Sequence, residues 1–141
     1  MDSQLEMAAG LLRESEYSMA FTGAGISVES GIPSFRGENG LWSKYDPEIL
    51  DLDVYFHRTN DAWKVIKEIF YDHFGHARPN AAHYSLANLE EAGMIQGVIT
   101  QNIDNLHQRA GSKSIHEFHG NSQFLLCTQC HKRYPVNEIA L

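Results

Sequence analysis

Hydrophobic positions along the chain follow two patterns, a helical spacing and short continuous runs. Apolar residues recur at helical spacing between Leu5 and Leu12, which predicts an amphipathic helix over residues 1–16. The short apolar run at 18–22 predicts a buried strand. A stretch rich in Gly, Ser and Pro follows at 23–40. It is too long for an ordinary turn, so a functional loop is expected there.

The rest of the chain alternates helical and strand-like patterns. An apolar face predicts a helix over residues 60–73, and Pro79 and Asn80 are typical of the start of another helix, which ends at Gly93. Strand-like runs follow at 95–100 and 114–118. This alternation predicts an α/β fold with a parallel sheet.

Each of the three predicted strands is followed directly by glycine or polar residues. In parallel α/β sheets, ligands bind beyond the carboxyl ends of the strands. If the strands are neighbours, these clusters converge on one crevice. The three clusters are Gly23-Ala24-Gly25, Gln101-Asn102-Ile103-Asp104 and His119-Gly120.

Composition narrows the class of protein. The 141 residues suit one domain or part of one, and 43% hydrophobic residues are enough for a packed core. The net charge of −7 and the lack of a basic run argue against a nucleic-acid surface. No apolar stretch is long enough to span a membrane, and the first residues lack the pattern of a signal peptide. We therefore expect a cytoplasmic protein without nucleic-acid or membrane contacts.

Taken singly, the candidate site residues allow ordinary structural roles. A Gly-Ala-Gly turn after a strand lets backbone N–H groups approach a diphosphate, but Val28 stands where a dehydrogenase fingerprint has its third glycine. A plain tight turn remains an alternative. Asn102 and Asp104 suit a turn or a helix cap, and Phe35 suits a core aromatic.

The joint spacing of these motifs resembles the sirtuin family, the NAD-dependent protein deacylases. The resemblance runs from Leu11 to the last residue, in the order of the family's motifs. The matching strings are Gly23-Ala24-Gly25-Ile26-Ser27, Gly31-Ile32-Pro33-Ser34-Phe35-Arg36-Gly37, Thr100-Gln101-Asn102-Ile103-Asp104, Leu106-His107, Ala110-Gly111 and His119-Gly120.

The resemblance implies a role for each matching position. His119, Asn102 and Asp104 correspond to the catalytic residues, with His119 as the general base. Histidine suits this role because it changes its protonation state near neutrality. His107 is expected to be structural. The implied NAD-binding residues are Gly23, Ala24, Gly25, Ser27, Phe35, Arg36, Gln101, Asn102, Ile103, Asp104 and His119.

The implied fold is a Rossmann-like sheet over residues 1–119, with a cofactor loop at 23–45 and a helical insertion at 46–78. Residues 120–141 would begin a small zinc-binding subdomain, with Cys127 and Cys130 as two of its ligands. A redox-active dithiol is the alternative for this pair. The family's second cysteine pair does not occur up to Leu141, so the chain is expected to match the N-terminal half to three-fifths of a sirtuin. A further segment or a second polypeptide would complete it.

The implied activity is NAD-dependent deacetylation of protein lysines, in which the acetyl group passes to ADP-ribose and nicotinamide is released. The implied partner is an acetyl-lysine protein or peptide, and the cofactors are NAD and zinc. Mono-ADP-ribosyl transfer and a non-catalytic interaction module remain alternatives.

The range of acyl groups depends on the helix after the cofactor loop. Sirtuins that prefer acidic acyl groups resemble one another in a Tyr-x-x-Arg pair, and our alignment places Ile66 and Ile69 there. Tyr71 is followed three residues later by Phe74 rather than arginine. A carboxylate in an apolar pocket without a partner is costly, so we expect acetyl to be preferred over succinyl.

Overall fold

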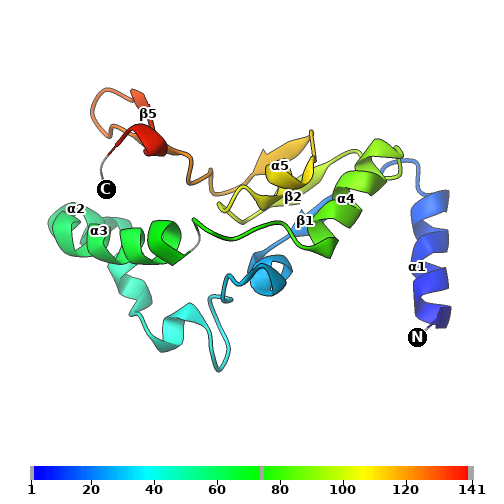
Figure 1. Cartoon of the computed structure of the whole chain (residues 1–141), viewed down its shortest axis with the longest axis horizontal. Coiled ribbons are helices and arrows are strands. Elements are labelled where there is room, and N and C mark those ends of the chain that lie inside the picture. Colours follow the sequence, from blue (N-terminus) through cyan, green and yellow to red (C-terminus); the bar gives the residue numbers. More distant parts are fainter. Residues whose placement is uncertain (1, 74, 140–141) are drawn as a thin grey trace.

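A parallel three-stranded sheet organises the protein, as a computed structural model shows for residues 2–73 and 75–139. The strands are β1 (Ala20–Thr22), β2 (Val98–Thr100) and β3 (Ile115–Glu117), in the order β1-β2-β3 (Figure 1). The register pairs Thr22 with Thr100 and Thr100 with Glu117. The predicted α/β class is therefore confirmed, and the three strands are neighbours, which was the condition for their loops to converge.

Helices flank and connect these strands. The predicted first helix is α1 (Asp2–Glu14), and the helix predicted from Asn80 is α4 (Ala81–Glu91). The helix predicted over 60–73 is α3 (Thr59–Lys67), continued by the π-helical turn η4 (Glu68–His73). The remaining elements are short: η1 (Ala24–Ser30), η2 (Leu41–Ser43), η3 (Pro47–Leu50), α2 (Leu52–His57), α5 (Leu106–Ala110), the hairpin β4 (Phe124–Leu126) and β5 (Arg133–Pro135), and η5 (Val136–Glu138).

One face of the sheet is covered by α4 and α5. His107 of α5 is buried and its Nε2 lies 2.9 Å from the Thr22 hydroxyl. The ring of His83, from α4, lies 4.9 Å from that of His107, centroid to centroid. Phe21 points to the other face and is 64% exposed, so the prediction of a buried β1 is wrong for this residue. The alternation along a strand places one face under the helices and leaves the other uncovered among the described residues.

Gly97 allows the chain to pass close to Ser114 at the start of β2. Its φ is +156°, a region that side chains disfavour, and a Cβ built there would overlap the carbonyl oxygen of Ser114. The Ser114 carbonyl accepts the N–H of Val98 at 2.8 Å, which begins the pairing of β2 with β3. A glycine is required here because the two segments approach more closely than a side chain allows.

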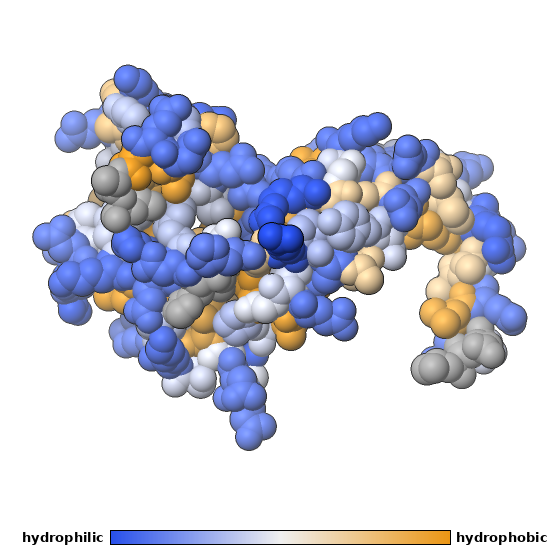
Figure 2. Space-filling model, in the orientation of Figure 1, coloured by the Kyte–Doolittle hydropathy of each residue, from blue (hydrophilic) through white to orange (hydrophobic). Residues whose placement is uncertain are grey.

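The core is small. Ile32, from the loop that follows β1, forms a buried cluster with Ala77 and Leu106. The helix α1 stands at one end of the molecule, where apolar residues remain at the surface (Figures 1 and 2). None of the helices in the described ranges combines the length and apolar character needed to cross a membrane.

Candidate functional site

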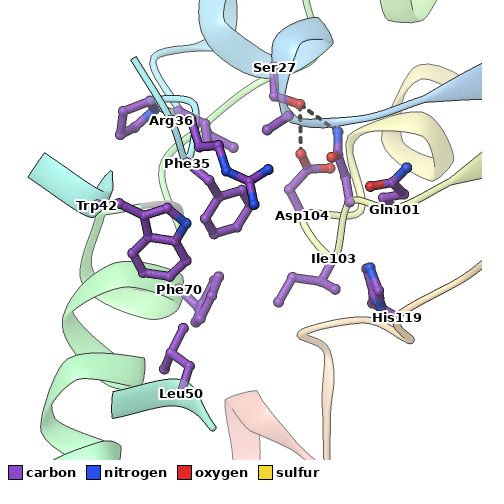
Figure 3. A pocket seen from close by; sticks show the side chains of 14 residues that line it. Ser27, Phe35, Arg36, Trp42, Leu50, Phe70, Gln101, Ile103, Asp104 and His119 are labelled. Carbon is purple, nitrogen blue, oxygen red and sulfur yellow. Dashed lines mark hydrogen bonds between the residues drawn. The ribbon is translucent and has the colours of Figure 1, made fainter. Parts of the chain in front are cut away.

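The three loops that follow β1, β2 and β3 meet at one cavity of about 600 Å³, which we call the strand-end cavity. The convergence expected from the sequence is therefore observed. Figure 3 shows Phe35, Trp42, Phe70 and Leu50 on one side of the cavity, facing Gln101, Ile103 and His119. The lining residues are Ala24, Ser27, Ile32, Pro33, Phe35, Arg36, Trp42, Leu50, Phe70, Gln101, Asn102, Ile103, Asp104 and His119.

A hydrogen-bond network on Ser27 joins the first two loops. The buried Ser27 hydroxyl donates to Oδ2 of Asp104 at 2.7 Å, and Nδ2 of Asn102 lies 3.3 Å from the same hydroxyl (Figure 3). Oδ1 of Asp104 accepts the N–H of Leu106 at 2.9 Å. Asp104 thus bonds the first residue of the short helix α5 and also lines the cavity. Its carboxylate is held in one orientation, with lone pairs left for a ligand.

The Gly-Ala-Gly turn leaves its backbone open. Gly23 has an extended φ of −140°, and a Cβ on Gly23 or Gly25 would meet no atom within 4 Å. The chain's own packing therefore does not require glycine at either position. Only Ala24 of the three lines the cavity, while the carbonyl of Gly23 accepts from Nδ2 of Asn102 at 3.0 Å. The open backbone fits the close approach of a diphosphate.

Phe35 and Arg36 belong to a tight loop that forms the opposite wall. The N–H of Trp42 donates to the Phe35 carbonyl at 3.0 Å, and the two rings lie 5.3 Å apart, centroid to centroid. A Cβ on Gly40 would lie 2.6 Å from the carbonyl carbon of Arg36, so the loop closes only with glycine there. Arg36 is exposed and lines the cavity, where a guanidinium can bind phosphate oxygens.

His119 stands at the rim of the cavity, opposite this loop. Its ring meets that of Phe118 edge-on, with centroids 5.0 Å apart and planes at 84°. The side chain is exposed, so a ring nitrogen can reach both a bound ligand and solvent. This position suits a group that takes up a proton from a ligand and releases it to water.

Several lining residues have no motif of their own in the sequence. Trp42, Leu50 and Phe70 give the cavity an apolar wall. Ile66 and Ile69, where our alignment places the acyl-specific pair, do not line it, and Ile69 is fully buried. The π-helical turn turns the neighbouring Phe70 toward the cavity instead. Only Phe70's apolar character could have indicated its role. Phe74 lies outside the described residues.

A buried polar layer lies directly beneath the site. The Thr100 hydroxyl accepts the N–H of Asn102 at 3.1 Å and lies 2.9 Å from the Thr22 hydroxyl, which in turn contacts His107. Burial lowers the pKa of His107, the neighbouring His83 lowers it further, and the charge of Asp104 opposes the shift. Burial also lowers the pKa of His83. Both histidines are therefore neutral near pH 7, and the burial of His107 fits the structural role expected of it.

Cys127 and Cys130 lie in the turn of the β4–β5 hairpin. The N–H of Cys127 donates to the Lys132 carbonyl at 3.0 Å, and its carbonyl accepts from His131 at 2.9 Å. Hydrogen bonds from the backbone of Cys130 and Gln129 lower the pKa of the Cys127 thiol, which favours the thiolate that a metal binds. Within the described ranges no three His, Cys, Asp or Glu side chains gather closely enough to hold a metal.

Comparison with known proteins agrees with this geometry. The chain is 49% identical to NAD-dependent protein deacylase 2 of Archaeoglobus fulgidus, over 98% of the chain and 54% of that protein. It is 47% identical to the NAD-dependent protein deacetylase of Thermotoga maritima, over 92% of the chain and 52% of that protein. The chain thus spans about half the length of these relatives.

Solved structures give the same assignment. A Sir2 complex with p53 peptide and NAD+ superposes with a TM-score of 0.86 at 43% identity, over 96% of this chain and 53% of that one. Sir2 bound to acetylated peptide gives 0.84 at 41% identity, over 96% and 53%. The model of the Sir2 family matches residues 23–141, more than half of the chain. The chain therefore belongs to the Sir2 family.

Proposed function

We propose that the protein is a NAD-dependent protein lysine deacetylase. The observation that carries the proposal is the convergence of Asn102, Asp104 and His119 with Phe35 on the strand-end cavity. The names of the relatives, and the NAD+ and acetylated peptide in similar structures, support it.

The open Gly23–Gly25 turn and Arg36 would hold the diphosphate of NAD. The turn would offer backbone N–H groups, since its glycines carry no side chain, and Arg36 would offer its guanidinium. Asn102 and Asp104 would receive the nicotinamide end. When bound, NAD supplies the ribose carbon that nicotinamide leaves and the ADP-ribose that accepts the acetyl group.

The chain's own residues then have three tasks. Asp104, fixed by Ser27 and the N–H of Leu106, accepts hydrogen bonds from the carboxamide in a constant orientation. Phe35, on its tight loop, covers the reacting centre and excludes water. His119 accepts a proton at a ring nitrogen and passes it to solvent at the rim.

The substrate side is an acetyl-lysine in a protein or peptide. Leu50, Trp42 and Phe70 form an apolar wall that suits the aliphatic lysine stem and a neutral acetyl group. The net charge of −7 supports a preference for basic, lysine-rich segments, chiefly through faster encounter.

The test is a reaction of the whole protein with NAD and an acetyl-lysine peptide. We expect one nicotinamide and one acetyl-ADP-ribose for each peptide deacetylated, measured by mass spectrometry. Without NAD the peptide should stay intact. Nicotinamide release with ADP-ribose attached to protein and an unchanged peptide would instead show mono-ADP-ribosyl transfer. If no nicotinamide forms at all, neither activity is present.

We infer also that Cys127 and Cys130 supply half of a structural zinc site, with the other ligands from outside this chain. The turn geometry and the lowered pKa of Cys127 support this. We expect about one zinc per molecule of the whole protein, and Cys127→Ala should lose both the metal and the fold of the hairpin. A soluble, active protein without zinc would show the dithiol alternative to be the better one.

A further inference from the structure

The side chain of Asn80 joins the start of α4 to the cofactor loop. Its Oδ1 accepts the N–H of Ala82 at 3.0 Å and that of His83 at 3.4 Å, which caps α4. Its Nδ2 donates to the Ile26 carbonyl at 2.7 Å and to the Ser30 hydroxyl at 3.0 Å. Both ends of the amide are therefore used, and the second pair of contacts reaches residues more than 45 positions earlier in the chain.

Helix capping alone does not explain asparagine at this position. Serine and aspartate cap a helix as well as asparagine does. Neither can donate two hydrogen bonds from the far side of the cap: serine is too short, and an ionised aspartate has only acceptors. Nδ2 of Asn80 supplies both of these hydrogen bonds, to the carbonyl of Ile26 and to the hydroxyl of Ser30. Only the amide satisfies the cap and the loop together.

The loop segment that Asn80 holds is the one that builds the cavity. Ile26 and Ser30 belong to η1, a 3₁₀-helix of seven residues. Helices of this kind longer than three or four residues are uncommon because their hydrogen bonds are poorly aligned. η1 also carries Ala24, which lines the cavity, and Ser27, which orients Asp104. Its position therefore decides where the diphosphate turn and the partner of Asp104 lie.

We propose that Asn80 is a positioning residue of the cofactor site, which holds η1 against the N-terminus of α4 so that the diphosphate turn is formed before NAD binds. The proposal rests on the proposed NAD-dependent function. Asn80 does not itself line the cavity, so it acts through η1.

The test separates the tether from the helix cap. Asn80→Ser and Asn80→Asp, made in the whole protein, keep an acceptor for the N–H groups of α4 and remove both donors to η1. We expect the amides of Ile26, Gly31 and Ile32, which are hydrogen-bonded within the loop, to exchange with deuterium about tenfold faster or more, while the amides of α4 keep their protection. The KM for NAD should rise about tenfold, with kcat and the KM for the peptide within about twofold.

Glu90 offers a matched control at the opposite end of α4. Its carboxylate accepts the N–H groups of Lys113 and Ser114, so it also joins α4 to a distant segment but lies away from η1. Glu90→Ala should lower the melting temperature without changing the KM for NAD. Ser30→Ala should give a smaller rise in that KM than Asn80→Ser, and should add nothing to it in the double variant.

Three results would overturn the proposal. If the loop amides exchange at an unchanged rate in both Asn80 variants, Asn80 does not hold η1. If exchange is faster but the KM for NAD is unchanged, Asn80 has no role in cofactor binding. If the KM for NAD rises equally in Glu90→Ala, the effect of the Asn80 variants is general destabilisation. A wild-type protein that consumes no NAD would instead refute the proposed function, and the exchange data would still decide whether Asn80 holds η1.

Discussion

The buried pair His83 and His107 should make the stability of the protein fall in acid. Burial lowers the pKa of both groups in the folded state, whereas histidine in an unfolded chain has its ordinary value near 6.5. Below about pH 6.5 the unfolded chain therefore binds more protons than the folded one. The stability contributed by neutral histidines is complete above this pH and is lost as the pH falls.

The magnitude follows from the burial of the two rings. Their exposed fractions are 0% for His83 and 1% for His107, and the two rings repel each other's charge, so neither is readily protonated while the protein is folded. A histidine that stays neutral in the folded state loses about 1.4 kcal/mol of stability between pH 7.5 and 5.5. The pair together loses at most about twice this, since the attraction of Asp104 opposes the shift.

The assay is urea denaturation of the wild-type protein and His107→Gln at pH 7.5 and 5.5. Glutamine places an amide near the Nε2 that contacts Thr22 but carries no titrating group. We expect the loss of unfolding free energy between the two pH values to be smaller in the variant by about 1 kcal/mol. His116→Gln, at an exposed position of β3, is the matched control and should behave as the wild type. An equal pH dependence in wild type and His107→Gln would refute the reasoning.

Two substitutions and one comparison of substrates test the site and the fold further. His119→Ala should lower turnover by about two to four orders of magnitude with little change in peptide binding; a loss within about threefold would show that His119 is not the base. Acetyl-lysine should be preferred over succinyl-lysine in the same peptide by a wide margin in kcat/KM, and equal efficiencies would contradict an apolar acyl pocket. Gly97→Ala should destabilise the fold by about 2–4 kcal/mol in thermal denaturation, because the backbone of Ser114 must move, whereas Gly10→Ala on α1, where a Cβ meets no atom within 4 Å, should not destabilise it.

The sheet and the place of the site could be predicted because their signals are local. Each strand is a short apolar run, and each is followed at once by glycine or polar residues, so the rule for parallel sheets was enough to bring Ala24, Asn102 and His119 together. The cap at Asn80 was likewise predicted from the residues beside it.

Features that depend on distant parts of the chain could not be predicted in this way. The link from Asn80 to Ile26 joins segments far apart in sequence, and no local pattern indicates it. The apolar spacing over 60–73 is the same for an α-helix and for one that ends in a π turn, so the turn of Phe70 into the cavity was missed. The exposure of Phe21 depends on which faces other elements cover.

The strand register has a consequence for how the site tolerates change in length. Thr22, Thr100 and Glu117 form a single row across the sheet, and each site loop has a residue that lines the cavity two positions later, namely Ala24, Asn102 and His119. One residue inserted within any of these steps would advance that loop by about 3.3 Å and reverse the side of its following residue. The spacing after each of the three strands is therefore as much a part of the site as the side chains, while the long connection between β1 and β2 can lengthen in its middle without moving the row.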